Sequence, residues 1–379
     1  MSYSEETLMR DVIRVGIIGA SPSRGWALAA HVPALQSLPD FEIYAVSTTN
    51  KRSAERSAQA LHATLAFDNH ADLLARSEID LVVIAVNVTR HRELVMAALS
   101  AGKPVYCEWP LGRNLTEAEE IAALAGRRGL RSTVGLQGRF SPAVRYLSDL
   151  LAEGYIGQLL NTRVAGAAPD DLWNGVLAPE YEITADPGSG NSLLAIPVGH
   201  ILDMMGFAVG EFASVASTLV ARRGKAILLR DRSTVPMPMH DQIAFSGTLE
   251  NGALASVHYY GGMSSGRDFV WELSGTEGTI VLSADRGYAN ISDLKIEGAQ
   301  RNGKIEALSI PNKYRLAPSS LPFAATNVAA LYTQYALDLA QGTSLVPDFE
   351  LAVRRHRLID AIQRSNASGR REFLTWSNP

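Results

Sequence analysis

The segment Val12–Trp26 (VIRVGIIGASPSRGW) contains the residues best suited to bind a phosphate group. An apolar, β-branched run ends at a glycine, a turn of small residues follows, and a helical pattern then begins. The backbone N–H groups and the helix N-terminus at such a point attract phosphate, and glycine lets the backbone approach it closely. The spacing is not G-x-G-x-x-G, and the longer turn adds side-chain donors; an ordinary strand–turn–helix is the alternative. We predict that the following residues bind the diphosphate of a dinucleotide: Gly19, Ala20, Ser21, Pro22, Ser23, Arg24, Gly25 and Trp26.

The second expected strand, Phe41–Ser47, ends in a polar and basic sequence, STTNKR. In dinucleotide-binding folds an acidic residue near this point holds the ribose 2′-hydroxyl. Here there is no carboxylate but there are two cations, which would form charge-assisted hydrogen bonds with a 2′-phosphate. This favours NADP over NAD, although NAD remains possible, and Lys51 and Arg52 would alternatively begin a helix on its solvated side. The expected contacts at this end of the cofactor are Ser47, Thr48, Thr49, Lys51 and Arg52.

These segments belong to a longer alternation of apolar strands and amphipathic helices that continues to about residue 138. Further strands are expected at Asp80–Val86, Pro104–Cys107 and Ser132–Gly135. Such alternation predicts a Rossmann-type, doubly wound parallel sheet of the α/β class, with ligands at the carboxyl ends of its strands. Loops at those ends are therefore candidate contacts. Val86, Asn87 and His91 are predicted to face the cofactor, and an exposed helix N-cap region is the alternative.

The second half of the chain has a different pattern. From about residue 158, period-2 segments predict an α+β domain with a large, mostly antiparallel open sheet. The expected strands include Ile291–Ile296 and Lys304–Ile310, and helices Phe323–Gln341 and Phe349–Ser365 are expected to pack back on the first domain. We therefore divide the chain into a dinucleotide-binding domain, 1–138, and a substrate and oligomerisation domain, 139–379. A half-exposed sheet of this size commonly packs against a second copy, so we expect a homodimer or homotetramer.

Composition narrows the possible functions. The 379 residues include 35 Lys or Arg against 39 Asp or Glu, so the net charge is −4, and the charges are spread evenly. Without a basic face or a long apolar run, nucleic-acid binding and membrane insertion are not expected. Cys107 is the single cysteine, which excludes an internal disulfide and a metal site built from several thiolates; no metal is expected. No signal-peptide core stands at the N-terminus, and a cytoplasmic protein is expected.

Three motifs carry a resemblance to a known family: GKPVYCEWPL at 102–111, VGLQGRFSP at 134–142 and GSGNSLLAIPVGHILD at 188–203. With the opening turn, they resemble the glucose-fructose oxidoreductase/inositol dehydrogenase (Gfo/Idh/MocA) family of nicotinamide-dependent sugar oxidoreductases. The long turn at 21–26 and the LQGR sequence at 136–139 resemble the branch of the yeast galactose-pathway repressor. The resemblance implies a nicotinamide cofactor and a sugar or polyol-like substrate.

The chain departs from this family at two positions. The family's E-K-P loop carries a lysine beside the nicotinamide that assists proton transfer, and Trp109 stands in its place. The family's Asp four residues before its His is replaced here by Ile196, whereas His200 is retained. The resemblance implies that Glu108 contacts the cofactor. It also matches Gln137 and Arg139 to a polar pair, for which ligand contact and structural hydrogen bonding are both open.

His200 is the best remaining candidate for the base that accepts the hydroxyl proton during hydride transfer, because histidine titrates near neutral pH. Asp203 lies three residues later on the same helical face, where it would orient His200; a buried capping and packing pair is the alternative. Trp109, whose indole N–H only donates, would stack on the nicotinamide or on a sugar ring. Trp173 and Tyr181 lie in an irregular stretch that would cover the sugar.

Two hypotheses of different classes follow. In the first, the protein is an NAD(P)-dependent oxidoreductase for a sugar-like substrate, and His200 handles the proton. In the second, it is a catalytically weak, NAD(P)-binding regulator that acts through a protein partner. The missing lysine favours the second hypothesis, and the retained His200 favours the first.

Overall fold

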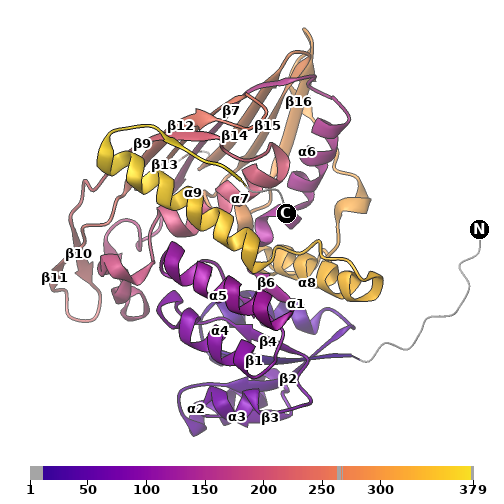
Figure 1. The fold of residues 1–379 in the computed structure, drawn as a ribbon, viewed down its shortest axis with the longest axis vertical. Coiled ribbons are helices and arrows are strands. Elements are labelled where there is room, and N and C mark those ends of the chain that lie inside the picture. Colours follow the sequence, from indigo (N-terminus) through magenta and orange to yellow (C-terminus); the bar gives the residue numbers. More distant parts are fainter. Residues whose placement is uncertain (1–11, 263–265, 267, 377–379) are drawn as a thin grey trace, which may run out of the picture.

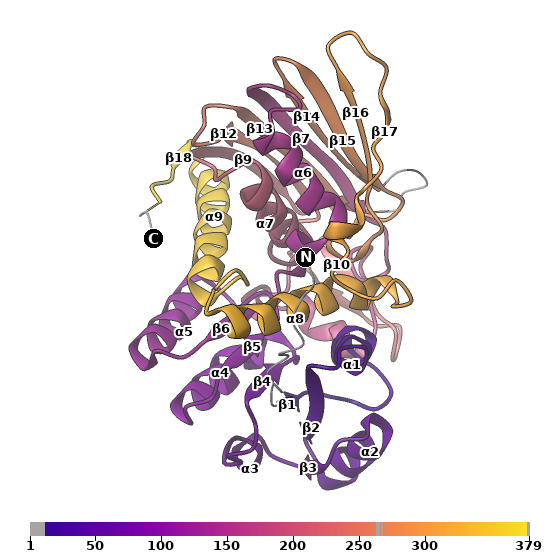
Figure 2. The ribbon, with the colours of Figure 1, turned by 90° about the vertical axis from the view of Figure 1, so that its right-hand side faces the viewer.

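The computed structural model describes residues 12–262, 266 and 268–376. A six-stranded sheet lies at one end of the molecule and a nine-stranded sheet at the other, with α7 (Gly199–Ala208), α8 (Phe323–Gln341) and α9 (Phe349–Ser368) between them (Figures 1 and 2). Within the described residues, no helix is both long enough and apolar enough to cross a membrane.

The first sheet has the strand order β3-β2-β1-β4-β5-β6, and all of its pairs are parallel. This confirms the predicted doubly wound sheet. Strands β2 and β3 lie on one side of β1, and β4, β5 and β6 lie on the other. The strand order therefore reverses between β1 and β4, which is where such folds bind ligands. The strands are β1 Ile13–Ile18, β2 Phe41–Ser47, β3 Leu65–Phe67, β4 Leu81–Ile84, β5 Val105–Cys107 and β6 Ser132–Val134. The helices are α1 Val32–Gln36, α2 Lys51–Leu61, α3 His70–Leu74, α4 His91–Ser100 and α5 Leu115–Arg128.

The turn after β1 requires glycine at its first position. Gly19 has φ +103°, and a Cβ there would lie 2.6 Å from the Ala85 carbonyl oxygen at the end of β4. Glycine therefore allows β1 and β4 to end side by side. The helix after the turn begins as a π-helical segment, Ala27–His31, and becomes α1, which contains Pro33 near its start.

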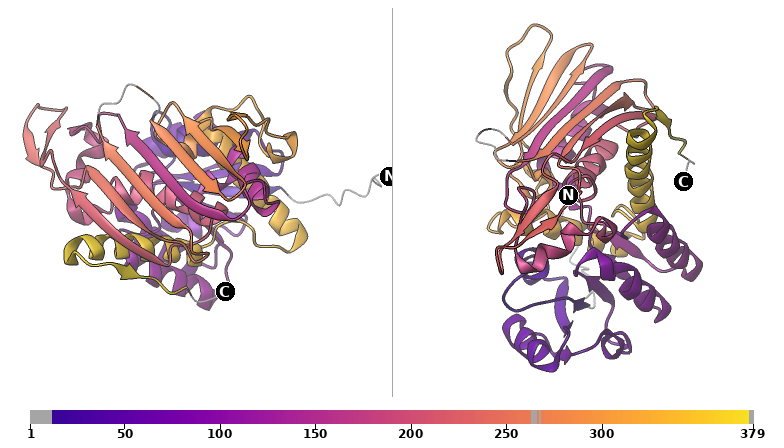
Figure 3. Two further views of the ribbon diagram at one scale, coloured as in Figure 1. Left: turned by 90° about the horizontal axis from the view of Figure 1, so that it is seen from above. Right: turned by 90° about the vertical axis from the view of Figure 1, so that its left-hand side faces the viewer.

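The second sheet has the order β17-β16-β15-β14-β7-β13-β12-β9-β18, in which β7 and β13 pair in parallel and the other pairs are antiparallel. This confirms the predicted large, mostly antiparallel sheet, whose outer face is open in the view of Figure 3. Its strands are β7 Leu159–Ala168, β9 Ser214–Val220, β12 Gln242–Thr248, β13 Leu254–Gly261, β14 Phe269–Gly275, β15 Gly278–Ala284, β16 Lys295–Gln300, β17 Glu306–Ala307 and β18 Glu372–Phe373.

Two strand predictions in this half were wrong in detail. The strand expected at Ile291–Ile296 begins at Lys295, because Ala289–Ile291 forms a 3₁₀ turn that ends the preceding loop. Of the segment 304–310, only Glu306 and Ala307 pair as a strand. A separate three-stranded sheet, β8 Val176–Leu177, β10 Lys225–Leu228 and β11 Thr234–Pro236, was not predicted, since its strands are short and far apart in the sequence.

The two C-terminal helices join the two sheets. Val328, Leu331 and Tyr332 of α8 share one buried cluster with Val15 and Ile17 of β1. Helix α9 packs between α5 and β9, and α6 (Pro142–Ala152) packs on α7. Side chains of α8 and α9 therefore reach the carboxyl ends of the first sheet, where a ligand is expected.

Candidate functional site

Backbone hydrogen bonds place the predicted loops along one edge of the first sheet. The Gly19 N–H donates to the Ser47 carbonyl at 3.0 Å, and the Glu108 N–H donates to the Ile84 carbonyl at 3.1 Å. The Gly135 N–H continues this edge by donating to the Cys107 carbonyl. The ends of β2, β1, β4, β5 and β6 therefore follow one another along the edge of the sheet where folds of this kind have their ligand crevice.

The turn predicted to bind the diphosphate is accessible. Ser23, Arg24 and Gly25 are exposed, and Gly25 has φ +95°. The Ala29 N–H donates to the Gly25 carbonyl at 3.1 Å, which is the first hydrogen bond of the helix. The N–H groups of residues 26–28 come before this bond and are available to an anion. The Arg24 guanidinium lies 3.8 Å from Glu180, which connects this turn to the segment carrying Tyr181.

At the end of β2, Asn50 caps α2 by accepting a hydrogen bond from the Ser53 N–H at 2.9 Å. Lys51 and Arg52 are the first two residues of α2, and both are exposed, as is Thr49. The Thr48 hydroxyl donates to the Asn50 carbonyl, and Ser47 is buried. Beginning a helix and presenting cations to a 2′-phosphate are compatible roles in this geometry.

The prediction that His91 contacts the cofactor was wrong. His91 is buried, with Nδ1 2.8 Å from the Pro110 carbonyl oxygen and Nε2 3.1 Å from the Val86 carbonyl oxygen. Burial lowers its pKa although the two carbonyl oxygens oppose this shift, and a neutral ring has one N–H, which donates to one of these two carbonyls. Asn87 is exposed and accepts hydrogen bonds from the N–H and hydroxyl of Thr89, which matches the N-cap alternative and leaves its amide NH₂ at the crevice.

Glu108 is held by two residues that the sequence analysis did not identify. His31 lies with Nε2 2.9 Å from the Glu108 carboxylate and Nδ1 2.7 Å from the Tyr332 hydroxyl, and both His31 and Tyr332 are buried. Burial raises the pKa of Tyr332 well above its ordinary value, so its hydroxyl keeps its proton, and the His31 ring connects this hydroxyl to the Glu108 carboxylate. The carboxylate lies over Gly135, where a Cβ would be 2.6 Å from Oε1. No local signal connects residues so distant in the chain.

The prediction that Trp109 stacks on a nicotinamide or sugar ring was wrong. Its side chain is 5% exposed, and the indole N–H donates to the Ala195 carbonyl at 2.7 Å. The indole lies against the His356 ring at a centroid distance of 4.8 Å and packs so closely on Gly199 that a Cβ there would lie 2.6 Å from Nε1. Trp109 therefore packs the loop Glu108–Pro110, called the E-W-P loop below, against α7 and α9.

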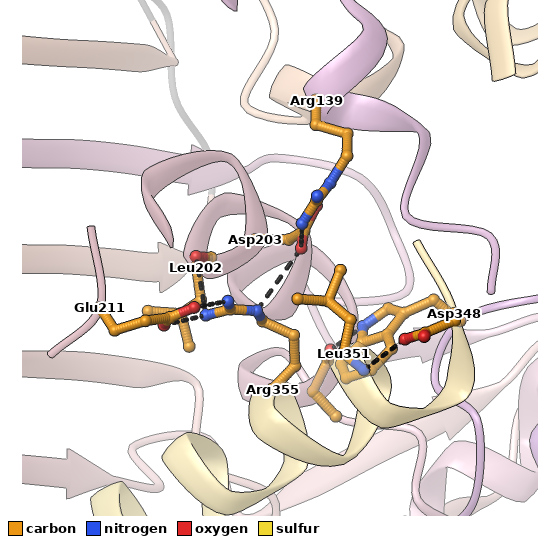
Figure 4. Close-up of polar contacts among 9 residues, drawn as sticks. Arg139, Leu202, Asp203, Glu211, Asp348, Leu351 and Arg355 are labelled. Atoms are coloured by element: carbon orange, nitrogen blue, oxygen red, sulfur yellow. Dashed lines mark hydrogen bonds and ion pairs between the residues drawn. The ribbon is translucent and has the colours of Figure 1, made fainter. Parts of the chain in front are cut away.

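The prediction that Asp203 orients His200 was also wrong. The Asp203 carboxylate receives hydrogen bonds from Arg139 at 2.9 and 2.5 Å and lies 3.5 Å from Arg355 (Figure 4). Arg355 binds Glu211 through both terminal nitrogens and donates to the Leu202 carbonyl. Although burial opposes it, the Glu211 carboxylate raises the pKa of Arg355.

This network also corrects the assignment of Arg139 to the cofactor. Its guanidinium is bound to Asp203 and lies over the Phe207 ring, so it is a structural group. The four side chains Arg139, Asp203, Glu211 and Arg355 form a buried cluster with balanced charges.

No hydrogen bond of the His200 or Gln137 side chain is found among the described residues. His200 is 6% exposed and its Nδ1 has no hydrogen-bond partner; Gln137 is 1% exposed and neither atom of its amide has one. Burial lowers the pKa of His200 to about 4, although the carboxylates of Glu108 and Asp203 oppose this shift. Buried polar groups are normally paired, so two such residues near one crevice favour a bound polar ligand.

The residues expected to cover a substrate have different environments. Trp173 is buried, and its indole N–H donates to the Tyr288 hydroxyl at 2.6 Å, so its expected contact with a sugar was wrong. Tyr181 is 48% exposed on the 3₁₀ segment Pro179–Ala185 and stays available to a ligand. Within the described residues, no group of three or more His, Cys, Asp or Glu is arranged to hold a metal ion.

Comparisons with known proteins agree with this architecture. Residues 13–136 match the model of the oxidoreductase family with an NAD-binding Rossmann fold, and residues 142–284 match the model of the Gal80p C-terminal domain. The chain is 31% identical to the galactose/lactose metabolism regulatory protein GAL80 of Saccharomyces cerevisiae over 326 residues, 78% of this chain and 73% of that protein. It is 29% identical to dehydrogenase aclE of Aspergillus oryzae over 94% of this chain and 97% of that one.

Solved structures show the same fold. A super-repressor mutant of Gal80p from Saccharomyces cerevisiae superimposes with a TM-score of 0.85 at 26% identity, covering 96% of this chain and 99% of that chain. Levoglucosan dehydrogenase in complex with NADH and L-sorbose shares the fold, with a TM-score of 0.82 at 22% identity, covering 97% of this chain and 100% of that chain.

The buried neutral histidines predict a loss of stability in mild acid. Burial lowers the pKa values of both His200 and His356 to about 4, whereas an unfolded histidine is protonated below about 6.5. Their contribution to stability is complete above about pH 6.5 and is lost as the pH falls towards 4, because only the unfolded state takes up protons in that window. Urea unfolding at about pH 7 and pH 5 should give a smaller acid-induced loss in His200→Gln and in His356→Phe, by about 2 kcal/mol each. The matched control is His62→Asn, which replaces an exposed histidine outside the nine-stranded sheet; equal losses in all proteins would contradict the assignment.

Proposed function

Because the chain belongs to the Gfo/Idh/MocA family of NAD-binding oxidoreductases and carries a Gal80-like C-terminal domain, we propose that it is a nicotinamide-dinucleotide-binding regulator that turns over slowly or not at all. The dinucleotide occupies the crevice at the strand ends of residues 1–138. Residues 139–379 bind a protein partner, and the bound dinucleotide changes that interaction. The expectation of a protein partner rests on the similarity to GAL80, which is a regulatory protein.

Three features support a dinucleotide in this crevice. The accessible turn at Ser23–Gly25 offers N–H groups to a diphosphate. Lys51 and Arg52 stand where a 2′-phosphate would lie, which favours NADP. The unpartnered amide of Gln137 is available to hydrogen-bond the nicotinamide end.

The position of Trp109 is the single observation that favours a regulator over an enzyme. Where the family has a lysine, this chain has an indole whose N–H is bound to Ala195 and whose ring packs on His356. His200 is the remaining candidate base, and with a pKa of about 4 it is far from the value that suits general base catalysis near neutral pH. Hydride transfer would lack the roughly 10²- to 10⁴-fold contribution of a well-tuned base.

The oxidoreductase hypothesis is the second candidate, and the free His200 Nδ1 favours it. A neutral imidazole accepts a proton from a carbinol hydroxyl, while the dinucleotide accepts the hydride from the same carbon. The similarity to the dehydrogenase aclE, which extends over nearly the whole chain, also supports this hypothesis. In that case a sugar-like substrate would lie between His200 and Tyr181.

The open face of the nine-stranded sheet is the proposed surface of a homodimer or homotetramer. It contains a depression of about 550 Å³ whose lining includes the small side chains of Ala165, Ala244, Ser246 and Ser256. A second copy of this face can approach such small side chains closely. Light scattering that gave the mass of one chain would contradict this assembly.

Turnover distinguishes the two candidate functions. With saturating NADP⁺ or NADPH and a panel of aldoses, ketoses, polyols and inositols, we expect saturable cofactor binding by fluorescence but no steady change in nicotinamide absorbance. The matched variant is His200→Asn, which removes the candidate base while keeping a polar side chain. Steady turnover that His200→Asn abolishes, with cofactor affinity unchanged, would establish the oxidoreductase instead.

Cofactor preference depends on the two cations that begin α2. Replacing both in the double variant Lys51→Ala/Arg52→Ala should weaken NADPH binding at least tenfold, about 1.4 kcal/mol, and leave NADH binding nearly unchanged. The control is Arg56→Ala, which removes an exposed cation one turn later on the same helix. Calorimetry that showed tighter NADH than NADPH binding in the parent protein would contradict the preference.

A further inference from the structure

A cavity of about 310 Å³ lies where the start of α5, the middle of α9 and the segment 187–195 meet. Helices α5 and α9 lie side by side in this region of the molecule (Figure 1). Its lining includes Asn114, Ser192, Ala195, His240 and His356. None of the residues assigned above to the dinucleotide or to the covering of a substrate lines it, so this cavity is distinct from the crevice.

The cavity has a buried polar side chain that lacks a partner. His356 is buried among the lining residues, and no described residue forms a hydrogen bond with its Nε2. Burial lowers the pKa of His356 to about 4, so the ring is neutral at ordinary pH and carries one N–H donor and one acceptor nitrogen. An unpaired buried group of this kind costs free energy until a ligand pairs it.

Neighbouring side chains add hydrogen-bonding groups without net charge. The Ser192 hydroxyl oxygen accepts from the Ala195 N–H at 2.9 Å, so its hydrogen is available to a ligand. Asn114 accepts from the Glu117 N–H at 3.0 Å through its oxygen, which leaves its NH₂ group as a donor.

The charged side chains of the lining are paired within their own segments. Arg113 binds the Glu117 carboxylate through Nε at 2.7 Å, and Asp360 forms an ion pair with Arg364. Glu117 also places a negative charge in the first turn of α5, which opposes an anion at that helix start. The cavity therefore favours an uncharged ligand.

We propose that this cavity is a second binding site, for a neutral, hydroxyl-rich molecule of monosaccharide size. Its volume lies at the lower end of the range of small-molecule pockets, about 300–1,000 Å³. Its donors and acceptors are neutral imidazole, amide and hydroxyl groups, which suit sugar hydroxyls. The site does not depend on the function proposed for the crevice.

Two contacts connect this site to the E-W-P loop. The His356 ring packs on the Trp109 indole, and the Ala195 carbonyl accepts the Trp109 N–H at 2.7 Å. Both His356 and Ala195 also line the cavity. A ligand in the cavity therefore changes the surroundings of Trp109, which gives an optical signal and a route to the crevice.

Titration with D-glucose and with myo-inositol tests the proposal. We expect saturable binding of at least one of them, in the millimolar range or tighter, by saturation-transfer NMR, together with a change in tryptophan fluorescence that Trp109→Phe removes. Two variants should weaken binding at least tenfold: His356→Phe, which keeps an aromatic ring against Trp109, and Pro238→Trp, which fills the cavity from its exposed rim. Pro238→Trp keeps the test valid if the buried substitution fails to fold.

The matched control is Pro236→Trp, an exposed proline that does not line the cavity and should leave binding unchanged. Binding should also persist in His200→Asn, because His200 lies outside the cavity. The proposal is overturned if neither compound binds saturably, if both cavity variants bind like the parent, or if His200→Asn alone abolishes binding.

Discussion

The Asp203 carboxylate is the contact on which the arrangement of the site depends. It joins Arg139, which follows the first sheet, to Arg355 of α9, and Glu211 completes the charge balance. Removing one partner from such a buried pair costs about 3–5 kcal/mol, because the other charge is left uncompensated. With these four side chains paired, α7 and α9 are fixed at the ends of β5 and β6, and His200 and His356 are fixed with them.

This arrangement explains why the site is well equipped to bind and poorly equipped to transfer protons. Asp203 is committed to two arginines, so it does not serve His200. Burial then lowers the pKa of His200 to about 4. The Trp109 indole is likewise held by its hydrogen bond to Ala195 and its ring contact with His356. Among the described residues, the free groups include the Gln137 amide, the His200 Nδ1 and the exposed turn after β1, which suit the binding of a dinucleotide.

Local patterns in the sequence predicted the fold but not the contacts of the site. Alternating apolar strands and helices predicted the parallel sheet, and period-2 segments predicted the second sheet, because both signals are periodic and local. The shared helical face of His200 and Asp203 suggested a pair, yet the stronger attraction of Arg139 and Arg355 determines where the carboxylate goes. His31 and Tyr332 could not be recognised, since their contact joins opposite ends of the chain. Stacking of Trp109 on a ligand ring was predicted from the chemistry of its side chain alone. In the structure the indole instead contacts the Ala195 carbonyl and the His356 ring.

The most direct test of this account is a crystal structure of the protein with NADPH bound. We expect the diphosphate at the turn after β1, the amide of Gln137 paired with the nicotinamide end, and the Trp109 N–H still bound to the Ala195 carbonyl. A structure in which the indole leaves Ala195 and His356 and stacks on the nicotinamide would contradict the account, as would a crevice that stays empty at saturating NADPH.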